Sequence, residues 1–204
     1  MAGAAYNFSF TAGGLLCSES VRVADEYARV LDWKATIESV QRQNLLQART
    51  ASAGDRVLHE VLSRLRLLTP VQLSLLRSGS SSDQRQLLWL ATCKRYQLLY
   101  EFGSEVIRNK FLQLDLTLGP TDFDAFLESK SIWHPEIEAL ADSTRAKLRQ
   151  VALRMLREAE ILSADNVIQP LLLAVVVARA IQADSIAHFN VFPVSEADIR
   201  RTLS

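Results

Sequence analysis

The polar, basic sequence Ser143-Thr-Arg-Ala-Lys-Leu-Arg-Gln150 runs directly into the apolar sequence Val151-Ala-Leu-Arg-Met-Leu-Arg-Glu-Ala-Glu-Ile-Leu162. At helical spacing, one face of this segment is apolar; it carries Leu148, Val151, Ala152, Met155, Leu156 and Ala159. A short turn, 163–166, then lies between two apolar pairs, Ile161-Leu162 and Val167-Ile168. A helix followed by a hairpin predicts a winged-helix unit, whose leading turn can enter the major groove of a nucleic acid.

The candidate nucleic-acid contacts of this unit lie at the start of the helix and are Ser143, Thr144, Arg145, Lys147 and Arg149. Arginine and lysine can bind phosphates or base edges, and hydroxyl groups and the helix amino terminus can add phosphate contacts. The alternative is a solvated helix whose charges face water, and spacing alone does not separate the two. Glu160 stands where winged helices often place glycine, so the helix is expected to end without a left-handed glycine cap.

A second basic turn is predicted near the amino terminus. A first helix is expected over 15–31, and a second from an Asp32 cap to about Asn44. A third helix, with leucines and a valine on one face, is expected to end near Leu68. The connection before the third helix gathers the candidate contacts Arg42, Arg49, Thr50, Ser52 and Arg56. Arg49 and Arg56 are expected to contact phosphate. Part of the charge can instead form a ladder in which Glu60 pairs at i,i+4 spacing with Arg56 and Arg64.

The remaining segments complete a mostly α-helical chain. Proline at a first helical position starts a short helix at Thr69-Pro70, which is followed by one long helix over 83–110 or by two helices with a break at Gly103. Thr117-Leu-Gly-Pro-Thr121 is the clearest linker. Beyond it, Thr121 and Ser195 are expected to cap helices, a short helix follows His134-Pro135, and an apolar helix covers 170–183. We therefore expect two helix-turn-helix-like units, an amino-terminal domain over 1–116 and a carboxy-terminal, winged-helix-like domain with a β-hairpin wing over 117–204.

The distribution of charge is uneven although the total is neutral, with 23 basic and 23 acidic residues. Residues 42–110 hold eleven basic and five acidic side chains, whereas 111–142 holds one basic and seven acidic side chains. Arginine outnumbers lysine 18 to 5, which suits bidentate contact with phosphate or guanine. The chain therefore has one basic and one acidic region, and either can bind a partner of opposite charge.

Signals for catalysis, metals and membranes are weak. The three histidines, His59, His134 and His188, are isolated from one another and from the two cysteines, and no phosphate-binding glycine motif is present. We expect no enzyme activity, cofactor or metal, and free thiols in a reducing compartment. The apolar run 171–178 is too short to cross a bilayer, which needs roughly 20 residues, so a buried core helix and a cytoplasmic, membrane-free protein are expected.

Five segments together resemble the BrxA family of bacterial BREX phage-exclusion systems. They are Tyr6-Asn-Phe-Ser-Phe-Thr-Ala-Gly-Gly-Leu-Leu16, Asp32-Trp33, Asn44-Leu-Leu-Gln-Ala-Arg-Thr50 with Arg56, Leu88-Trp-Leu-Ala-Thr-Cys-Lys-Arg-Tyr96 and Ser143-Thr-Arg-Ala-Lys-Leu148. The resemblance implies an all-helical protein, compared in that family with the RNA-binding antiterminator NusB, and a role in binding nucleic acid, above all double-stranded DNA. Some descriptions of the family suggest an inner-membrane protein, against which the hydropathy of this chain argues.

The expected function is non-enzymatic binding of double-stranded DNA, mainly through the phosphate backbone, beside other BREX proteins. Two alternatives stay open. One is RNA binding of the NusB type, and the other is a protein-interaction adaptor whose acidic and basic regions dock BREX partners. Reversing the charges of Arg145 and Arg149 together is predicted to abolish nucleic-acid binding while helicity survives.

Overall fold

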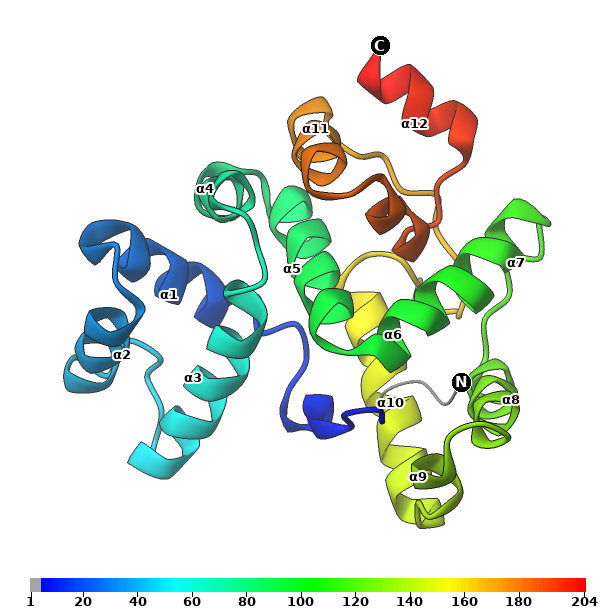
Figure 1. Cartoon of the computed structure of the whole chain (residues 1–204), viewed down its shortest axis with the longest axis horizontal. Helices are drawn as coiled ribbons and strands as arrows, with labels where there is room; N and C mark the ends of the chain where they lie inside the picture. The colour runs from blue at the N-terminus through cyan, green and yellow to red at the C-terminus, as the bar shows by residue number, and fades with distance from the viewer. Residues whose placement is uncertain (1–4) are drawn as a thin grey trace.

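Helix α5, Ser81–Arg95, lies at the centre of the molecule, with helices packed on both sides of it (Figure 1). The structure is a computed structural model and describes residues 5–204. Helices α1, α3 and α4 contact α5 on one side, and α10 and the 3-10 helix η3 contact it on the other. The prediction of a mostly α-helical chain is confirmed.

Four helices form the amino-terminal group: α1 (Cys17–Val30), α2 (Trp33–Arg42), α3 (Ala51–Leu65) and α4 (Pro70–Ser78). The predicted Asp32 cap is confirmed, since its Oδ1 accepts a hydrogen bond of 2.7 Å from the backbone N–H of Ala35. Thr69 and Gln72 form a capping box around Pro70, which satisfies backbone donors that the first helical turn leaves free. The sequence therefore predicts these helix starts from their capping residues.

The central run contains α5, α6 (Gln97–Glu101), the π-helix η2 (Phe102–Ile107) and α7 (Arg108–Leu112). The break lies at Tyr96, whose backbone is extended, and the prediction of a break at Gly103 is wrong. A Cβ at Gly103 would lie 3.2 Å from the Cα of Val191, so glycine lets η3 (Ile186–Val191) approach. Trp89 fixes the same contact, because its Nε1–H donates to the Val191 carbonyl at 2.9 Å.

The carboxy-terminal group contains α8 (Pro120–Ser131), α9 (Pro135–Glu138), α10 (Asp142–Glu158), α11 (Val175–Asp184) and α12 (Glu196–Leu203). The predicted Ser195 cap is confirmed as a capping box with Asp198. Thr121 is not the cap of α8, because the helix begins one residue earlier and the Asp122 carboxylate accepts from the Gly119 N–H at 2.7 Å. All six apolar positions predicted for the inner face of α10 are buried.

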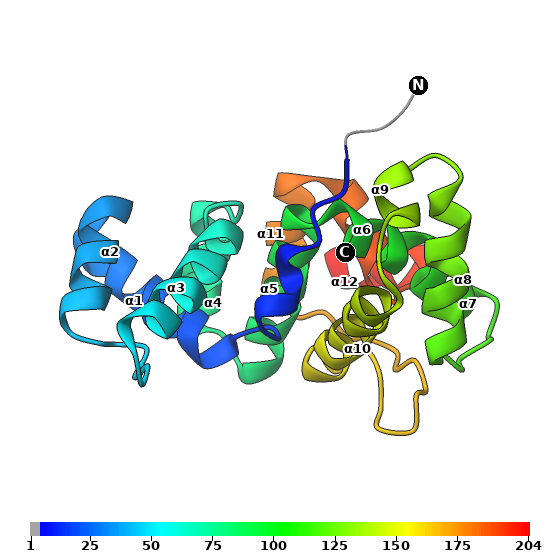
Figure 2. The ribbon, with the colours of Figure 1, turned by 90° about the horizontal axis from the view of Figure 1, so that it is seen from below.

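The predicted β-hairpin wing is wrong: the described residues 5–204 contain only isolated bridges and no strand. Leu162 pairs with Ile168, and Val167 pairs with Thr117 instead of continuing that ladder. The Ile168 N–H donates to the Leu116 carbonyl at 2.7 Å. The segment Val167-Ile168, predicted as the second strand of the hairpin, is therefore paired both with Leu162 and with residues 116–117. With Leu162 and Ile168 buried in the core, only a short loop projects beyond α10 (Figure 2).

Helix α10 ends in a left-handed cap that is built on glutamate. Glu160 has φ of 61°, the Ile161 N–H donates to the Leu156 carbonyl at 2.9 Å, and the Glu160 N–H donates to the Arg157 carbonyl at 3.1 Å. These two bonds form the Schellman arrangement, which usually has glycine at the left-handed position. The expectation that this cap would be missing is wrong, since Glu160 adopts it despite its Cβ.

The apolar segment 170–183 is only partly helical. Helix α11 begins at Val175, and residues 170–174 form an irregular connection in which the side chain of Leu172 is 84% exposed. The prediction of a buried core helix therefore holds for Val177, Ala178 and Ile181 and is wrong for the residues before them. Within 5–204, none of the helices combines the length and apolarity that crossing a bilayer requires.

The amino-terminal segment 5–16 contacts both groups of helices. The Tyr6 N–H donates to Glu136 Oε1 at 2.9 Å, and the Leu15 N–H donates to Glu158 Oε2 at 2.6 Å. On the other side, Arg64 Nη1 donates to the Gly14 carbonyl at 2.8 Å. The hydrogen bonds of this segment therefore link the two predicted domains, 1–116 and 117–204. The division into these domains stays a prediction.

Candidate nucleic-acid interface

The amino-terminal candidates lie together where α2 ends and α3 begins. We call Arg42, Arg49, Thr50, Ser52 and Arg56 the α3 turn; all five residues are exposed. Thr50 is the N-cap of α3, and its Oγ1 accepts from the Ala53 N–H at 3.2 Å while its own O–H can still donate. Arg49, Thr50 and Ser52 therefore lie at the amino terminus of α3, where the helix dipole favours an anion, while Arg42 ends α2 and Arg56 lies in the second turn of α3.

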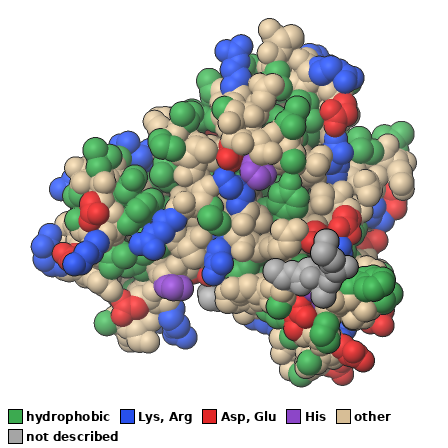
Figure 3. Space-filling model, in the orientation of Figure 1, with side chains coloured by type: hydrophobic (Ala, Val, Ile, Leu, Met, Phe, Trp, Pro, Cys, Tyr) green, Lys and Arg blue, Asp and Glu red, His purple; other side chains and the backbone are tan. Residues whose placement is uncertain are grey.

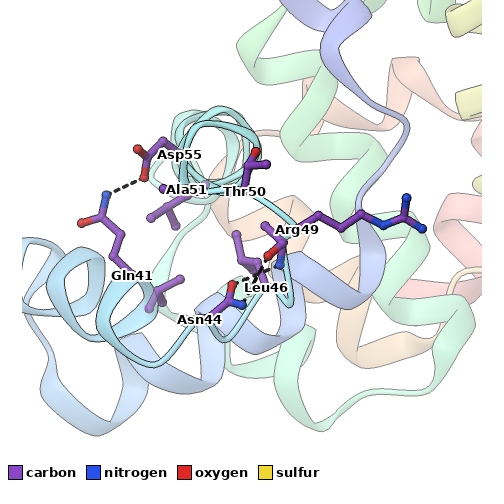
Figure 4. A pocket seen from close by; sticks show the side chains of 11 residues that line it. Gln41, Asn44, Leu46, Arg49, Thr50, Ala51 and Asp55 are labelled. Carbon is purple, nitrogen blue, oxygen red and sulfur yellow. Dashed lines mark hydrogen bonds between the residues drawn. The ribbon is translucent and has the colours of Figure 1, made fainter.

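A pocket of about 390 Å³ lies beside the α3 turn (Figure 4). Asn44 closes α2 with φ of 46° and accepts from the Ala48 N–H at 3.0 Å, which folds the connection back on itself. Gln41 Nε2 donates to Asp55 Oδ1 at 2.7 Å and joins α2 to α3. The Arg49 side chain extends away from this pair in Figure 4. The connection 43–50 is longer than the turn of about three or four residues that joins the helices of many DNA-binding proteins.

The positive charges of the α3 turn are not neutralised within the described residues. None of Arg42, Arg49 and Arg56 is within ion-pair distance of a carboxylate in the part of the chain that the structure describes. Asp55, the acidic residue nearest to them in α3, is engaged by Gln41. The α3 turn is therefore a basic surface that is open to an anionic partner.

The predicted charge ladder on α3 is only half formed. Arg64 Nη2 lies 2.6 Å from Glu60 Oε1 in a buried ion pair, and the Tyr96 hydroxyl donates to the same carboxylate at 2.7 Å. Glu60 is buried and pairs with Arg64, so the alternative in which Arg56 also joins the ladder is not formed. Burial is the first cause that raises the pKa of Tyr96, and the Glu60 carboxylate raises it further by accepting its hydrogen bond. Arg56, one helical turn before Glu60, remains exposed.

The carboxy-terminal candidates lie at the start of α10 and are partly engaged in packing. Arg145 Nη2 donates to the Ile137 carbonyl at 2.8 Å, and its Nε donates to the Leu140 carbonyl at 3.3 Å. Arg149 Nη1 lies 2.5 Å from Asp124 Oδ2. These arginines fasten α10 to α8 and to the end of α9.

The other candidates at the start of α10 are more accessible. Ser143 and Lys147 are exposed and Thr144 is half-buried. Lys147 Nζ donates to Gln150 Oε1 at 3.3 Å and has no carboxylate partner among the described residues. Helices α3 and α10 both begin at the lower edge of the view in Figure 1, so the two basic helix starts share one side of the molecule.

Two further sets of side chains extend the basic surface. His59 is exposed one turn after Arg56 on α3. Its position three residues after Arg56 is the sequence signal that it shares the same helix face. On α10, Arg154 and Arg157 are exposed; Arg154 lies 3.5 Å from Glu158, and Arg157 donates to Asn166 Oδ1 at 2.6 Å.

The structure shows free thiols at both cysteines, as predicted. Cys17 is half-buried and Cys93 is buried, and burial raises the pKa of the Cys93 thiol well above its ordinary value. Over residues 5–204, no three histidine, cysteine, aspartate or glutamate side chains gather where they could hold a metal ion. The candidate site therefore consists of arginines and hydroxyl groups around the starts of α3 and α10, and this combination is suited to binding anions.

A family model described as BrxA matches residues 4–185, which is most of the chain. The chain belongs to the BrxA family. A protein called BREX protein BrxA from Bacillus cereus (strain H3081.97) is 29% identical over 122 residues, which cover 60% of this chain and 61% of that protein. Another BREX protein BrxA, from Escherichia coli O9:H4 (strain HS), is 26% identical over 147 residues, 72% of this chain and 69% of that protein. The similarity thus spans about three fifths of the length of the Bacillus cereus protein.

The BrxA-family chain shares its fold with a solved structure. The crystal structure of an uncharacterized protein from Magnetospirillum magneticum superposes with a TM-score of 0.78, over 93% of this chain and 99% of that one. At 21% sequence identity, this likeness concerns the fold alone.

Proposed function

We propose that this chain is a non-enzymatic component of a BREX phage-defence system that binds double-stranded DNA in the cytoplasm, mainly through arginine and lysine contacts to phosphate. The observation that carries the proposal is the α3 turn, where Arg42, Arg49 and Arg56 are exposed and without a carboxylate partner among the described residues. The phage-defence setting rests on membership of the BrxA family and on relatives named BREX protein BrxA.

The α3 turn is suited to hold a phosphate group. The guanidinium groups can form paired hydrogen bonds with phosphate oxygens, and the hydroxyls of Thr50 and Ser52 can donate to them. Backbone N–H groups at the start of α3 point toward the same position and favour negative charge. In this proposal Ser143, Thr144, Arg145, Lys147 and Arg149 on α10 supply a second contact along the duplex, with Lys147 the most accessible cation of that set.

Phosphate contacts predict a steep dependence on salt, because each neutralised phosphate releases a condensed cation. About five contacts give a slope near −4.5 in a double-logarithmic plot, so affinity should fall several hundredfold between about 50 and 200 mM salt. Fluorescence anisotropy with a labelled duplex of mixed sequence measures this directly. Absence of binding at the lower salt concentration would exclude the proposal.

Two alternatives are tested in the same experiment. Competition of unlabelled duplex RNA and single-stranded RNA against the labelled DNA decides whether the chain prefers RNA, as the NusB comparison implies. An adaptor that docks BREX proteins without nucleic acid would leave the anisotropy unchanged and would be captured by a purified BREX component instead. Lys110 lies 2.5 Å from Asp115 and 3.1 Å from Asp122. Part of the negative charge of region 111–142 is therefore neutralised within the chain, which weakens the support for the adaptor alternative.

A further inference from the structure

An apolar groove lies at the end of the molecule opposite to α8 and α9. It has a volume of about 360 Å³ and lies between the end of α1, the start of α2 and α4. Tyr27 and Trp33 stack within it with ring centroids 3.8 Å apart, and Arg66 lies over the Trp33 ring at 5.7 Å. We call this site the α1–α4 groove.

The rim of the groove is unusually apolar for a surface exposed to water. Leu31, which lines the groove, is 75% exposed; Val30, Leu67 and Val71 are also exposed, and each is next in the sequence to a residue that lines the groove. Single exposed apolar side chains are ordinary, but a cluster of them around a groove marks a surface that binds another macromolecule. Two cations line the groove: Arg66 has no carboxylate partner among the described residues, and Arg77 pairs with Asp25 at 2.9 Å.

At the other end, the turn between α8 and α9 presents two large apolar side chains to solvent. Ile132 and Trp133 are each 73% exposed, and the Trp133 N–H donates to the Lys130 carbonyl at 3.1 Å, which fixes the turn. Acidic side chains surround the pair along the chain: Glu128, whose side chain is 79% exposed, and the exposed Glu138 and Asp142. We call Ile132 and Trp133 the α8–α9 knob.

The knob and the groove are complementary in shape and in charge. The knob is a projecting apolar pair among acids, and the groove is an apolar recess among cations. Figure 3 shows acidic side chains gathered at the lower right, over α8 and α9, and lysine and arginine side chains gathered at the left, over α1 and α2. Tryptophan is also the residue that most often anchors an interface when it fills a pocket on the partner.

We propose that the α8–α9 knob of one copy of this chain docks into the α1–α4 groove of the next copy. The contact joins one end of a copy to the other end of the next, so it continues into a head-to-tail chain unless two antiparallel copies make it twice and close a dimer. Such a contact is small and therefore weak in solution. On a duplex the copies would be held side by side at high effective concentration, and association would then make DNA binding cooperative. The inference goes beyond the proposed function and does not depend on it.

Two substitutions that each disable one surface test the proposal by analytical ultracentrifugation without DNA. Trp133→Asp removes the knob, and Leu31→Asp disables the groove at a left-handed position that aspartate tolerates. Wild-type protein should show a mass that rises with concentration up to about 1 mM, whereas each variant alone should remain monomeric. An equimolar mixture of the two variants should form dimers and nothing larger, since each contributes the surface that the other lacks.

Other outcomes overturn the proposal. Wild type that stays monomeric at about 1 mM excludes it, and a mixture of the two variants that stays monomeric shows that self-association uses other surfaces. Circular dichroism confirms that both variants fold, and Arg66→Glu provides a second groove variant in which only the charge complementarity changes. With a duplex short enough for one copy, Trp133→Asp should bind as tightly as wild type. A failure of docking is thereby distinguished from a failure of DNA binding.

Discussion

The starts of α3 and α10 carry nearly the same sequence signature and yet differ in the charge that they offer to a partner. Both place arginines around a serine and a threonine at a helix amino terminus. At α3 neither neighbouring acid pairs with these arginines, since Glu60 is buried against Arg64 and Asp55 accepts a hydrogen bond from Gln41. At α10 the arginines meet Asp124 and the free carbonyls at the end of α9. A count of basic residues therefore overstates the charge available at α10.

The largest effect is expected when the α3 turn is reversed in charge. Arg49→Glu with Arg56→Glu should lower affinity for duplex DNA about a hundredfold near 100 mM salt and reduce the salt slope by about two, because two phosphate contacts are lost. Anisotropy titrations measure both quantities. Arg200→Glu with Arg201→Glu on α12 makes the same change of net charge at another exposed site, and equal losses in the two variants would show a general effect of charge.

At α10 the same reversal should act on stability first. Arg145→Glu with Arg149→Glu removes hydrogen bonds to two carbonyls and places acids beside Asp124 and Glu128, so the free energy of unfolding should fall by about 2 kcal/mol. Urea denaturation measures this change. Affinity, measured where the variant is folded, should fall less than tenfold instead of being abolished as the sequence alone predicts, because both arginines are engaged within the chain. A complete loss of binding in folded protein would show that α10 and not α3 dominates the interface.

Freeing a paired arginine should have a smaller effect of opposite sign. Asp124→Asn removes the partner of Arg149 and one negative charge from the side of the molecule that carries the basic helix starts. We expect affinity for duplex DNA to rise about threefold and the salt slope to steepen by up to one. Glu138→Gln, which removes a charge without releasing an arginine, is the matched control. Unchanged affinity for Asp124→Asn would mean that Arg149 does not reach phosphate.

The smallest effect concerns the end of α10. Glu160→Gly relieves the left-handed backbone, worth about 1 kcal/mol, and loses the half-exposed ion pair with Arg85, worth about 0.5 kcal/mol. The melting temperature should therefore rise by about 2 °C with no change in DNA affinity. A lower melting temperature would show that the pair with Arg85 contributes more than the strained backbone costs.

Local sequence predicts what depends on neighbours along the chain. The inner face of α10 and the caps at Asp32, Thr69 and Ser195 follow from spacing and hydrogen-bonding groups within one helical turn. The break at Tyr96 has no such local signal, and the hydrogen-bond partner of the Tyr96 side chain, Glu60, lies 36 positions away. The prediction of a β-hairpin around 163–166 is wrong for the same kind of reason, since Leu116 and Thr117, which are distant in sequence, pair with Ile168 and Val167.

In the candidate site, too, local features follow from the sequence and contacts between distant residues do not. The residue types of both basic turns are visible in the sequence, and the structure shows the five residues of the α3 turn exposed between the end of α2 and the second turn of α3. Which arginines are free is decided by acids and carbonyls from other helices, such as Asp124 for Arg149. Spacing along one helix cannot reveal those partners. The spacing allowed Glu60 to pair with Arg56, Arg64 or both, and the structure shows Glu60 with Arg64 and Tyr96.

The amino-terminal segment sets an order for folding during synthesis. Tyr6 and Leu15 leave the ribosome early, yet their hydrogen-bond partners Glu136 and Glu158 lie 130 and 143 positions later in the chain. The first helices must therefore wait without this connection until α9 and α10 have been made. Contacts so distant in sequence form slowly, because a long loop has to close first. A ribosome stalled before α10 would hold a chain whose first residues can contact Arg64 and Tyr96 but not Glu158.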